Sequence, residues 1–527
     1  MFIYFMPQIY AWQSNFMYSD IILFIRLFIY SSLFIIISVV FYIFFISINI
    51  ITPRWRNYSE VNFKSFTLFI TSLFSIYFFI FSGFLYSFLF SNFSINSDFS
   101  TGSSLHVFFD SIVVDFSSSY GFTSIFNVTF SKFSLIFFLL FCFLYPIIIS
   151  LMGVDYSPTN FRFYIYMVCV FFLSYYLLMV ENILLFYFIY EIILILVFGA
   201  MYNTSNSRGS VEAAIFYIGW AILGSILVGL GVILVIALSG SVTFTDLKNN
   251  SLSSSEVYYI YILFFFGFGT KLSTWPFWYW LPKAHVEVST GMSVFLSCIL
   301  IKLSYFCLFR FQFALSSEIS FNVCIVVTFL SAIDTIFRFI NLKDLKAIIA
   351  YSSVLHTNLL LALVHLDTFK IINGTVLYVW GHSLATASIF IAVNLIESRY
   401  SSRNIIQVSG LWYTTPLLGY LTLWSILFFL DLPITLFFWG ELWLWIVTCN
   451  ALPFVALQVL FLCNVIFISI FFKIWWGVLF GSPDSTVQKI NSVEFRELIT
   501  LLLWVIFVQF LLGIQPSILT TYAGYIF

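Results

Sequence analysis

Residues 182–201 read NILLFYFIYEIILILVFGAM, an apolar run that contains a single charged residue, Glu191. About 20 apolar residues in a helix span the ~30 Å core of a bilayer, where a helix satisfies its own backbone hydrogen bonds. The run therefore predicts a membrane-spanning helix with a carboxyl group near its middle. Because a charge at that depth costs roughly 2.5–3.5 kcal/mol on insertion scales, Glu191 is a candidate functional residue.

The whole chain has the composition of this run. Of its 527 residues, 62% are hydrophobic and only 8% are charged, whereas a soluble domain carries roughly 25% charged residues. So few charges cannot cover a water-facing surface, and the sequence predicts an all-α polytopic membrane protein. The net charge of −1 provides no basic surface for nucleic acid.

The sequence predicts no cofactor and no metal in this chain. Its seven cysteines are scattered and form no C-x-x-C pair, which argues against iron–sulfur, zinc and disulfide frameworks. Bis-histidine haem sites need matched histidines on two facing helices, whereas the helical histidines here are single. There is no flavin or nucleotide motif either, so any redox chemistry is expected in partner subunits.

Apolar runs between polar breaks predict about fourteen membrane spans, with boundaries good to a few residues. The expected spans are 19–50, 65–92, 131–152, 161–180, 182–201, 212–240, 256–281, 285–312, 319–341, 343–366, 371–397, 408–447, 452–480 and 497–521.

Two spans are predicted to be broken near mid-membrane. The seventh contains Pro276 and Pro282, and the twelfth is interrupted by Asp431-Leu432-Pro433, because proline removes a backbone donor and clashes with the preceding turn. Broken helices five spans apart are typical of two inverted five-helix repeats in a transporter. The expected parts are N-terminal helices with a structured extramembrane loop at 93–130 (1–130), a first half (131–312), a second half (313–480) and a C-terminal helix (481–527).

Further polar residues fall inside predicted spans. Lys271, Lys302 and Glu441 are charged, and His356 and His382 lie in the tenth and eleventh spans. Ion pairs that only fix helix packing are one explanation, but polar groups in several helices at similar depth favour a proton relay. Desolvation disfavours a charged lysine and a neighbouring carboxylate restores it, so Lys271 near Glu191 would make a switchable site. Charges near helix ends, such as Lys346 and Arg403, are expected to reach the interface by snorkelling.

Three ordered motifs give the chain a family resemblance. They are LPKAHVE at 281–287, DLKAIIAYSS at 344–353 followed by His356, and Leu432-Pro433 followed by Gly440-Glu441. Over roughly 130–480 the sequence resembles the antiporter-like subunits of respiratory complex I. Val288-Ser289 and the lone Pro433 stand where that family usually has further prolines, which affects the geometry expected at the breaks. Glu441 departs from subunit 5, which carries lysine there, and subunit 2 lacks this form of LPKAHVE.

The resemblance implies roles for the buried polar residues. Glu191 and Lys271 match the family's interacting pair, Lys302 its central lysine, and Glu441 the glutamate on the exit side. The resemblance also implies a hydrated axis between them, lined by His285, His356 and His382.

The function that the resemblance implies is proton translocation driven by quinone reduction elsewhere in the complex. It implies antiporter-like subunits 2 and 5 as neighbours, together with accessory subunits and lipids. The chain contains 71 phenylalanines, and residues 1–20 form no Arg-rich presequence. These two features predict mitochondrial encoding and an inner-membrane location. A standalone cation/proton antiporter and a scaffold subunit without a proton path are the alternatives.

Overall fold

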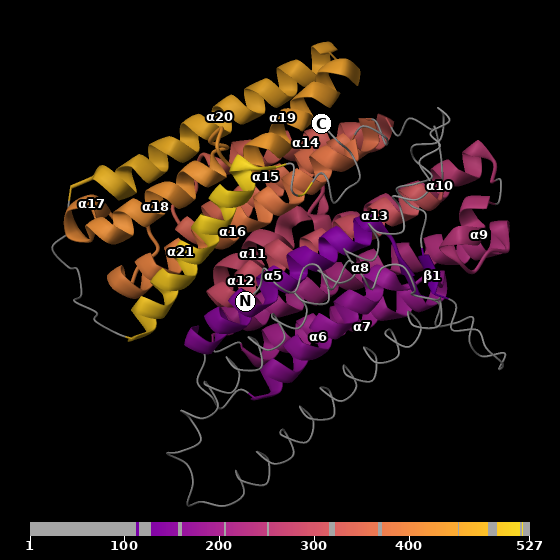
Figure 1. The fold of residues 1–527 in the computed structure, drawn as a ribbon, viewed down its shortest axis with the longest axis horizontal. Coiled ribbons are helices and arrows are strands. Elements are labelled where there is room, and N and C mark those ends of the chain that lie inside the picture. The colour runs from indigo at the N-terminus through magenta and orange to yellow at the C-terminus, as the bar shows by residue number, and fades with distance from the viewer. Residues whose placement is uncertain are drawn as a thin grey trace, which may run out of the picture. The chain divides into compact units, whose positions relative to one another are not determined.

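The computed structural model describes residues 112–114, 128–155, 161–204, 207–249, 252–315, 322–366, 371–451, 453–482, 493–516 and 519 (Figure 1). The first two expected spans, 19–50 and 65–92, lie outside these residues. The short strands β1 (Ile112–Val114) and β2 (Val128–Phe130) pair antiparallel, so part of the stretch expected to be a structured loop is β-structure. Every other element among the described residues is a helix.

The helices follow the predicted spans closely. In the earlier part of the chain they are α5 (Lys132–Asp155), α6 (Phe161–Met179), α7 (Ile183–Asn203), α8 (Arg208–Ser239), α9 (Phe244–Asn249), α10 (Ser254–Leu272), η3 (Phe277–Tyr279), α11 (Trp280–Glu287), α12 (Thr290–Phe295), the π-helical segment η4 (Leu296–Leu300) and α13 (Ile301–Ala314). In the later part they are α14 (Asn322–Phe339), α15 (Leu345–Leu366), α16 (Ile371–Tyr400), α17 (Leu411–Thr414), α18 (Pro416–Phe429), α19 (Leu436–Ala451), α20 (Pro453–Phe480) and α21 (Val493–Ile514).

Six helical stretches among the described residues are long and apolar enough to cross a membrane. They differ in how much of the bundle surrounds them. The stretches in α12–α13 and in α16 are 100% buried and that in α15 is 94% buried, whereas those in α7 and α8 are only 44% buried. The helices that carry Lys302, His356 and His382 are therefore enclosed by protein, and α7 and α8 have faces suited to lipid or a neighbouring subunit.

The first predicted break is present, but the chain is interrupted at only one of the two prolines expected there. Helix α10 ends at Leu272, and Ser273 adopts a left-handed backbone with φ of 57° before Pro276. Pro282 does not break the chain a second time. It lies in the first turn of α11, where its missing N–H would have no intrahelical partner in any case.

Neighbouring side chains satisfy the backbone at this break. The carbonyl of Leu272 accepts from Thr357 at 3.4 Å, and that of Ser273 accepts from Asn358 at 3.2 Å. The indole of Trp280 donates to the carbonyl of Thr270 at 2.6 Å. Because no water is available at membrane depth, such partners are what allows a helix to end there.

The expected start of the eighth span at residue 285 is wrong. The helix that carries Lys302 begins at Thr290, with Ser289 as its N-cap, and continues through α12, η4 and α13. His285 therefore belongs to α11, the second part of the broken seventh helix. The polar cap at Ser289 separates this segment from the helix that carries Lys302.

The second predicted break lies between α18 and α19. Asp431 has a left-handed backbone with φ of 57°, like Ser273 at the first break. The Thr435 hydroxyl accepts from the backbone N–H of Phe438 at 3.3 Å and caps the start of α19. Helix α16 packs against both of these helices, α18 and α19, and also against α15 and α21 (Figure 1).

Candidate functional site

Lys302 and His382 form the central contact of the site. The Nζ atom of Lys302, on α13, lies 2.7 Å from Nδ1 of His382, on α16, and 2.9 Å from the carbonyl oxygen of Ser297. Lys302 and His382 are each 1% exposed. Ser297 lies in the π-helical segment η4, a kind of irregularity that often occurs at functional sites. The structure thus joins two predicted residues that are 80 positions apart in the chain.

The polar line continues from His382 through His356 to Tyr378. The two imidazole rings have centroids 5.6 Å apart. The Tyr378 hydroxyl donates to the backbone carbonyl of His356 at 3.0 Å and lies 3.2 Å from its Nδ1. Since that hydroxyl hydrogen is used, Nδ1 of His356 is the donor to Tyr378 and its Nε2 is a free acceptor site. Among the described residues, Nε2 of neither histidine has a hydrogen-bond partner.

Glu441 lies at the far end of this line, on α19. It is 8% exposed, and the side-chain amide of Asn464, on α20, donates to its Oε1. Asp431, in the second break, and Glu441 both lie close enough to Tyr378 to interact with it electrostatically. Asp431, Asn464 and Tyr378 were not predicted as site residues, because only packing brings them beside Glu441.

Two glycines set the distance between α16 and α19. A Cβ at Gly381 would lie 2.5 Å from the backbone N and Cα of Phe437, and a Cβ at Gly440 would lie 2.5 Å from those of Tyr378. Each glycine directly precedes a predicted site residue, His382 or Glu441. The close approach of the two helices therefore holds the histidine and glutamate ends of the line together.

Lys271 and Glu191 interact without forming an ion pair. The Nζ atom of Lys271 lies 3.6 Å from the ring centroid of Tyr190, a cation–π contact. Glu191 directly follows Tyr190 in the chain and acts electrostatically on Lys271. No ion pair within 4.0 Å joins the two charges among the residues that the structure describes. The structure places the Lys271 ammonium on the ring of Tyr190, the residue before Glu191, and the sequence analysis did not predict this contact.

His285 lies apart from the Lys302–Glu441 line. Its ring packs against Phe390 with centroids 5.3 Å apart, and it is 0% exposed. Neither ring nitrogen has a hydrogen-bond partner among the described residues. The backbone carbonyl of the next residue, Val286, accepts a hydrogen bond from a second charged group.

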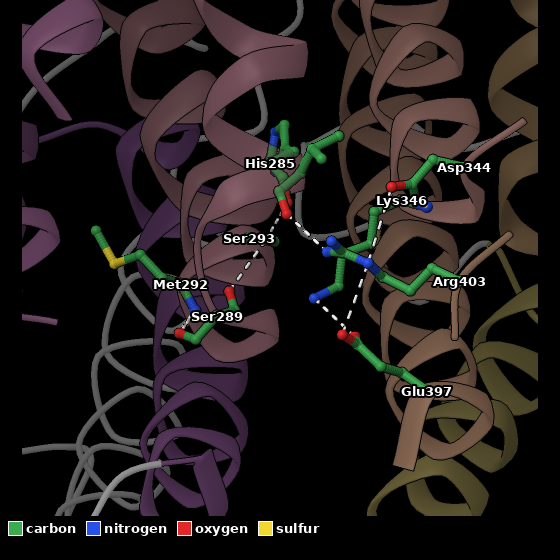
Figure 2. Close-up of polar contacts among 9 residues, drawn as sticks. His285, Ser289, Met292, Ser293, Asp344, Lys346, Glu397 and Arg403 are labelled. Atoms are coloured by element: carbon green, nitrogen blue, oxygen red, sulfur yellow. Dashed lines mark hydrogen bonds and ion pairs between the residues drawn. The ribbon is translucent and has the colours of Figure 1, made fainter. Parts of the chain in front are cut away.

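That second group is an ionic cluster at the end of α11, shown in Figure 2. Lys346 pairs with Glu397 at 3.0 Å, and Arg403 lies 3.6 Å from Glu397 and 3.8 Å from Asp344. Arg403 also donates to the backbone carbonyl of Val286 at 2.7 Å. The expectation that Lys346 snorkels to the interface is wrong, because its side chain is only 5% exposed and is paired within the protein.

A further buried polar cluster was also missed by the sequence reasoning. Nε2 of His365, on α15, lies 2.9 Å from the hydroxyl of Tyr261, on α10, and Oε1 of Gln312, on α13, is 3.3 Å from the same hydroxyl. His365 stands near a helix end, and no local pattern points to Tyr261 or Gln312. Only the packing of three helices brings them together.

The comparison with protein families now identifies the group to which this arrangement belongs. A family described as NADH:quinone oxidoreductase/Mrp antiporter, TM, matches residues 180–467, more than half of the chain. The chain belongs to this family. Three solved structures, each under 25% identical to the chain, share its fold.

The curated relatives of this antiporter-family chain are similar over most of their length. NADH-ubiquinone oxidoreductase chain 4 of Paramecium tetraurelia is 28% identical, over 63% of this chain and 70% of the relative. The corresponding protein of Chondrus crispus is 27% identical, over 70% and 76%. These relatives confirm the resemblance to the antiporter-like subunits and, among them, to subunit 4. Glu441 agrees with this, because subunit 5 carries lysine at that position.

Solved structures agree on the fold. A chain of the Mrp complex from Dietzia sp. has a TM-score of 0.70 and 18% identity, covering 88% of this chain and 96% of that one. A chain of respiratory complex I from Thermus thermophilus has a TM-score of 0.67 and 21% identity, covering 76% and 84%. A chain of the archaeal membrane-bound sulfane sulfur reductase has a TM-score of 0.71 and 17% identity, covering 88% and 91%.

Proposed function

We propose that this chain is a membrane-arm subunit of an NADH:ubiquinone oxidoreductase and carries protons through its buried Glu/Lys/His residues. The observation that supports this most directly is the enclosed polar line from Lys302 through His382, His356 and Tyr378 to Glu441. Burying so many ionisable groups costs free energy, so their presence indicates that they have a function. Relatives named chain 4 of that enzyme support the same proposal.

The central proton transfer crosses the contact between Lys302 and His382. The Lys302 ammonium gives one proton to Nδ1 of His382 across 2.7 Å, leaving a neutral amine and an imidazolium. His382 then releases a proton from Nε2 toward His356. Nε2 of neither ring has a hydrogen-bond partner among the described residues, so this step needs a bridging water.

The input to this line is electrostatic. Lys271 rests on the Tyr190 ring and lies within reach of the Glu191 charge without an ion pair. A small movement or protonation of Glu191 therefore changes how firmly Lys271 keeps its proton. Lys271 then exchanges its proton with Lys302, and His285 lies beside the ionic cluster of Lys346 (Figure 2). Glu441 passes the proton toward one side of the membrane.

The same proposal covers the setting of the chain. We place it in the mitochondrial inner membrane, encoded by the mitochondrial genome, beside antiporter-like subunits 2 and 5, accessory subunits and lipids. Its architecture has about fourteen spans with two inverted five-helix repeats in 131–312 and 313–480, flanked by 1–130 and 481–527. Matching left-handed residues at the two breaks, Ser273 and Asp431, support the repeat. The quinone reduction that drives pumping, and every redox centre, belong to partner subunits.

A standalone cation/proton antiporter is the second candidate, because the Dietzia Mrp chain has the same fold. The two differ in their partners. A complex I subunit copurifies with NADH oxidation activity in a native gel of solubilised membranes, whereas an antiporter runs in a smaller band without it. A scaffold subunit is the third candidate, and it predicts that matched apolar residues replace the buried charges without loss of pumping.

The test of the relay is Lys302→Met in the assembled complex. We expect normal assembly on a native gel and a fall in protons pumped per NADH oxidised, because the central donor is lost. Lys473→Met is the matched control, since Lys473 lies on the exposed face of a membrane helix and its loss should leave pumping unchanged. Normal pumping by the Lys302→Met complex would falsify the relay.

A further inference from the structure

We propose that His365, Tyr261 and Gln312 form a second proton-binding site, which connects Lys302 with the end of the bundle where α10 begins and where α13 and α15 end. This inference rests on the proposed function, which names no residue through which protons reach the relay from that end. None of the three residues lies in the motifs that the chain shares with its family.

The three residues lie at the same level on three neighbouring helices. Each is nine or ten residues along its own helix from a residue of the proposed relay. The pairs are Tyr261 and Lys271 on α10, Gln312 and Lys302 on α13, and His365 and His356 on α15. At 1.5 Å per residue this separation is about 15 Å. Because hydrogen bonds join the three side chains, the displacement has the same direction in every helix. The cluster therefore lies between the relay and one end of the bundle.

The hydrogen bonds of His365 determine which of its ring nitrogens exchanges a proton. Its Nδ1 lies 2.6 Å from the carbonyl oxygen of Leu361, and a carbonyl oxygen only accepts, so Nδ1 carries a hydrogen. Nε2 lies 2.9 Å from the hydroxyl of Tyr261. In the neutral ring Nε2 is the acceptor, and it is the atom to which a further proton binds. The ring packs edge-on against Phe265 with centroids 5.2 Å apart, which holds it in this orientation.

The Tyr261 hydroxyl serves both protonation states of His365. It has one hydrogen, and its oxygen lies 2.9 Å from Nε2 of His365 and 3.3 Å from Oε1 of Gln312. When the ring is neutral, the hydroxyl donates to Nε2. When the ring is charged, Nε2–H donates to the hydroxyl oxygen and the hydroxyl donates to Gln312. The buried ring can therefore gain or lose a proton without the movement of a heavy atom.

Tyr305 provides a buried hydroxyl between the cluster and Lys302. Lys302, Tyr305 and Gln312 are separated by three and then seven residues, so they lie on one face of α13. Tyr305 is 1% exposed and lies close enough to Tyr261 to interact with it electrostatically. Bridging waters are needed for the rest of the separation of about 15 Å. This face of α13 therefore leads from the cluster to the central lysine in polar steps.

The transfer balances in protons and needs no electron. A proton from water at that end of the bundle binds the Tyr261 oxygen while the hydroxyl hydrogen passes to Nε2 of His365, so one O–H bond forms, one breaks and the ring becomes a cation. The ring then returns a proton from Nε2 to the Tyr261 oxygen, and the hydroxyl hydrogen leaves toward Tyr305 and the neutral amine of Lys302. Since Glu441 is the proposed exit, the cluster acts as an entry that restores the Lys302 ammonium.

The test uses the assembled complex in liposomes, with His365→Gln, Tyr261→Phe and Lys302→Met. Glutamine forms hydrogen bonds as the neutral ring does but takes up no proton, and phenylalanine lacks only the hydroxyl. We expect both cluster variants to assemble and to lower proton pumping per NADH to the value of Lys302→Met. Because the residues act on one path, His365→Gln combined with Lys302→Met should pump no less than Lys302→Met alone. Tyr259→Phe is the matched control, since Tyr259 lies on the same helix and is 68% exposed, and it should pump normally.

The outcomes separate this inference from the proposed function. If Lys302→Met lowers pumping while His365→Gln and Tyr261→Phe pump normally, the second site is wrong and the relay stands. If all three variants pump normally, the proposed function is wrong as well. A double variant that pumps less than Lys302→Met would show that the cluster does not act through Lys302, and it would overturn the inference. Should the His365→Gln complex not assemble, Tyr261→Phe decides, because its ring keeps the packing against His365.

Discussion

The close crossing of α16 and α19 makes Gly440→Ala the most informative perturbation. A Cβ at Gly440 would lie 2.5 Å from the backbone N and Cα of Tyr378, whereas carbon atoms pack at about 3.5–4.0 Å. Backbone atoms cannot rotate away as a flexible side chain can. The two helices must therefore separate by about 1 Å, the difference between those distances.

The expected effect on function is larger than the effect on stability. Overpacking of this kind costs about 1–3 kcal/mol, which a large complex tolerates. A displacement of about 1 Å at reacting groups can reduce a rate on the order of 100-fold. Since Glu441 follows Gly440 directly and Tyr378 is the clashing residue, the Tyr378–Glu441 end of the line is displaced first. We expect assembly with strongly reduced proton pumping.

The assay is proton pumping per NADH oxidised by the purified complex in liposomes, alongside its thermal unfolding temperature. Gly477→Ala is the matched control, because a Cβ there meets nothing within 4 Å. It lies on a membrane helix, as Gly440 does, and should leave both measurements unchanged. If Gly440→Ala pumps like Gly477→Ala, the crossing does not position the site and the reasoning fails.

Three further outcomes follow from single contacts. Tyr190→Phe should retain the cation–π contact with Lys271 and pump nearly normally. Tyr190→Leu should lose about 0.5–2 kcal/mol of ammonium stabilisation and pump measurably less. Equal pumping by the two variants would contradict this role of the ring. Trp280→Phe removes the donor to the carbonyl of Thr270 at the first break. It should destabilise the complex by about 1–3 kcal/mol, measured by thermal unfolding. An unchanged unfolding temperature would show that this hydrogen bond is dispensable. Arg403→Leu leaves the carbonyl of Val286, at the end of α11, without its donor. It should speed hydrogen exchange in that helix. Exchange at the original rate would mean that the arginine does not fix α11.

The sequence was sufficient for most of the helices in the part of the chain that the structure describes. Apolar runs of about 20 residues predict membrane helices, because only a helix satisfies its backbone in lipid. Prolines and the Asp431-Leu432-Pro433 interruption predicted where two helices end, and charges within apolar runs were visible as candidates without any alignment. The motifs at 281–287 and 344–353 were enough to indicate the family. These features are local, so a linear reading finds them.

Local patterns were less reliable where one residue type has two structural outcomes. Pro282 was expected to break a helix, but proline is tolerated in the first turn of α11. The start of the eighth span was placed at residue 285, whereas Ser289 caps a new helix at Thr290. Lys346 was expected to snorkel from a helix end, and the bundle pairs it with Glu397 instead. In each case the neighbours of the residue decided the outcome.

The contacts that would carry protons were decided by tertiary structure alone. Lys302 meets His382 across 80 residues of sequence, and Asn464 meets Glu441 across 23. Helical periodicity specifies which face of one helix a residue occupies, but it does not specify the neighbouring helix or its depth. Those are set by close packing, as at Gly440 against the backbone of Tyr378. The sequence by itself determined which groups are buried, and the packing of the helices determined which of them touch.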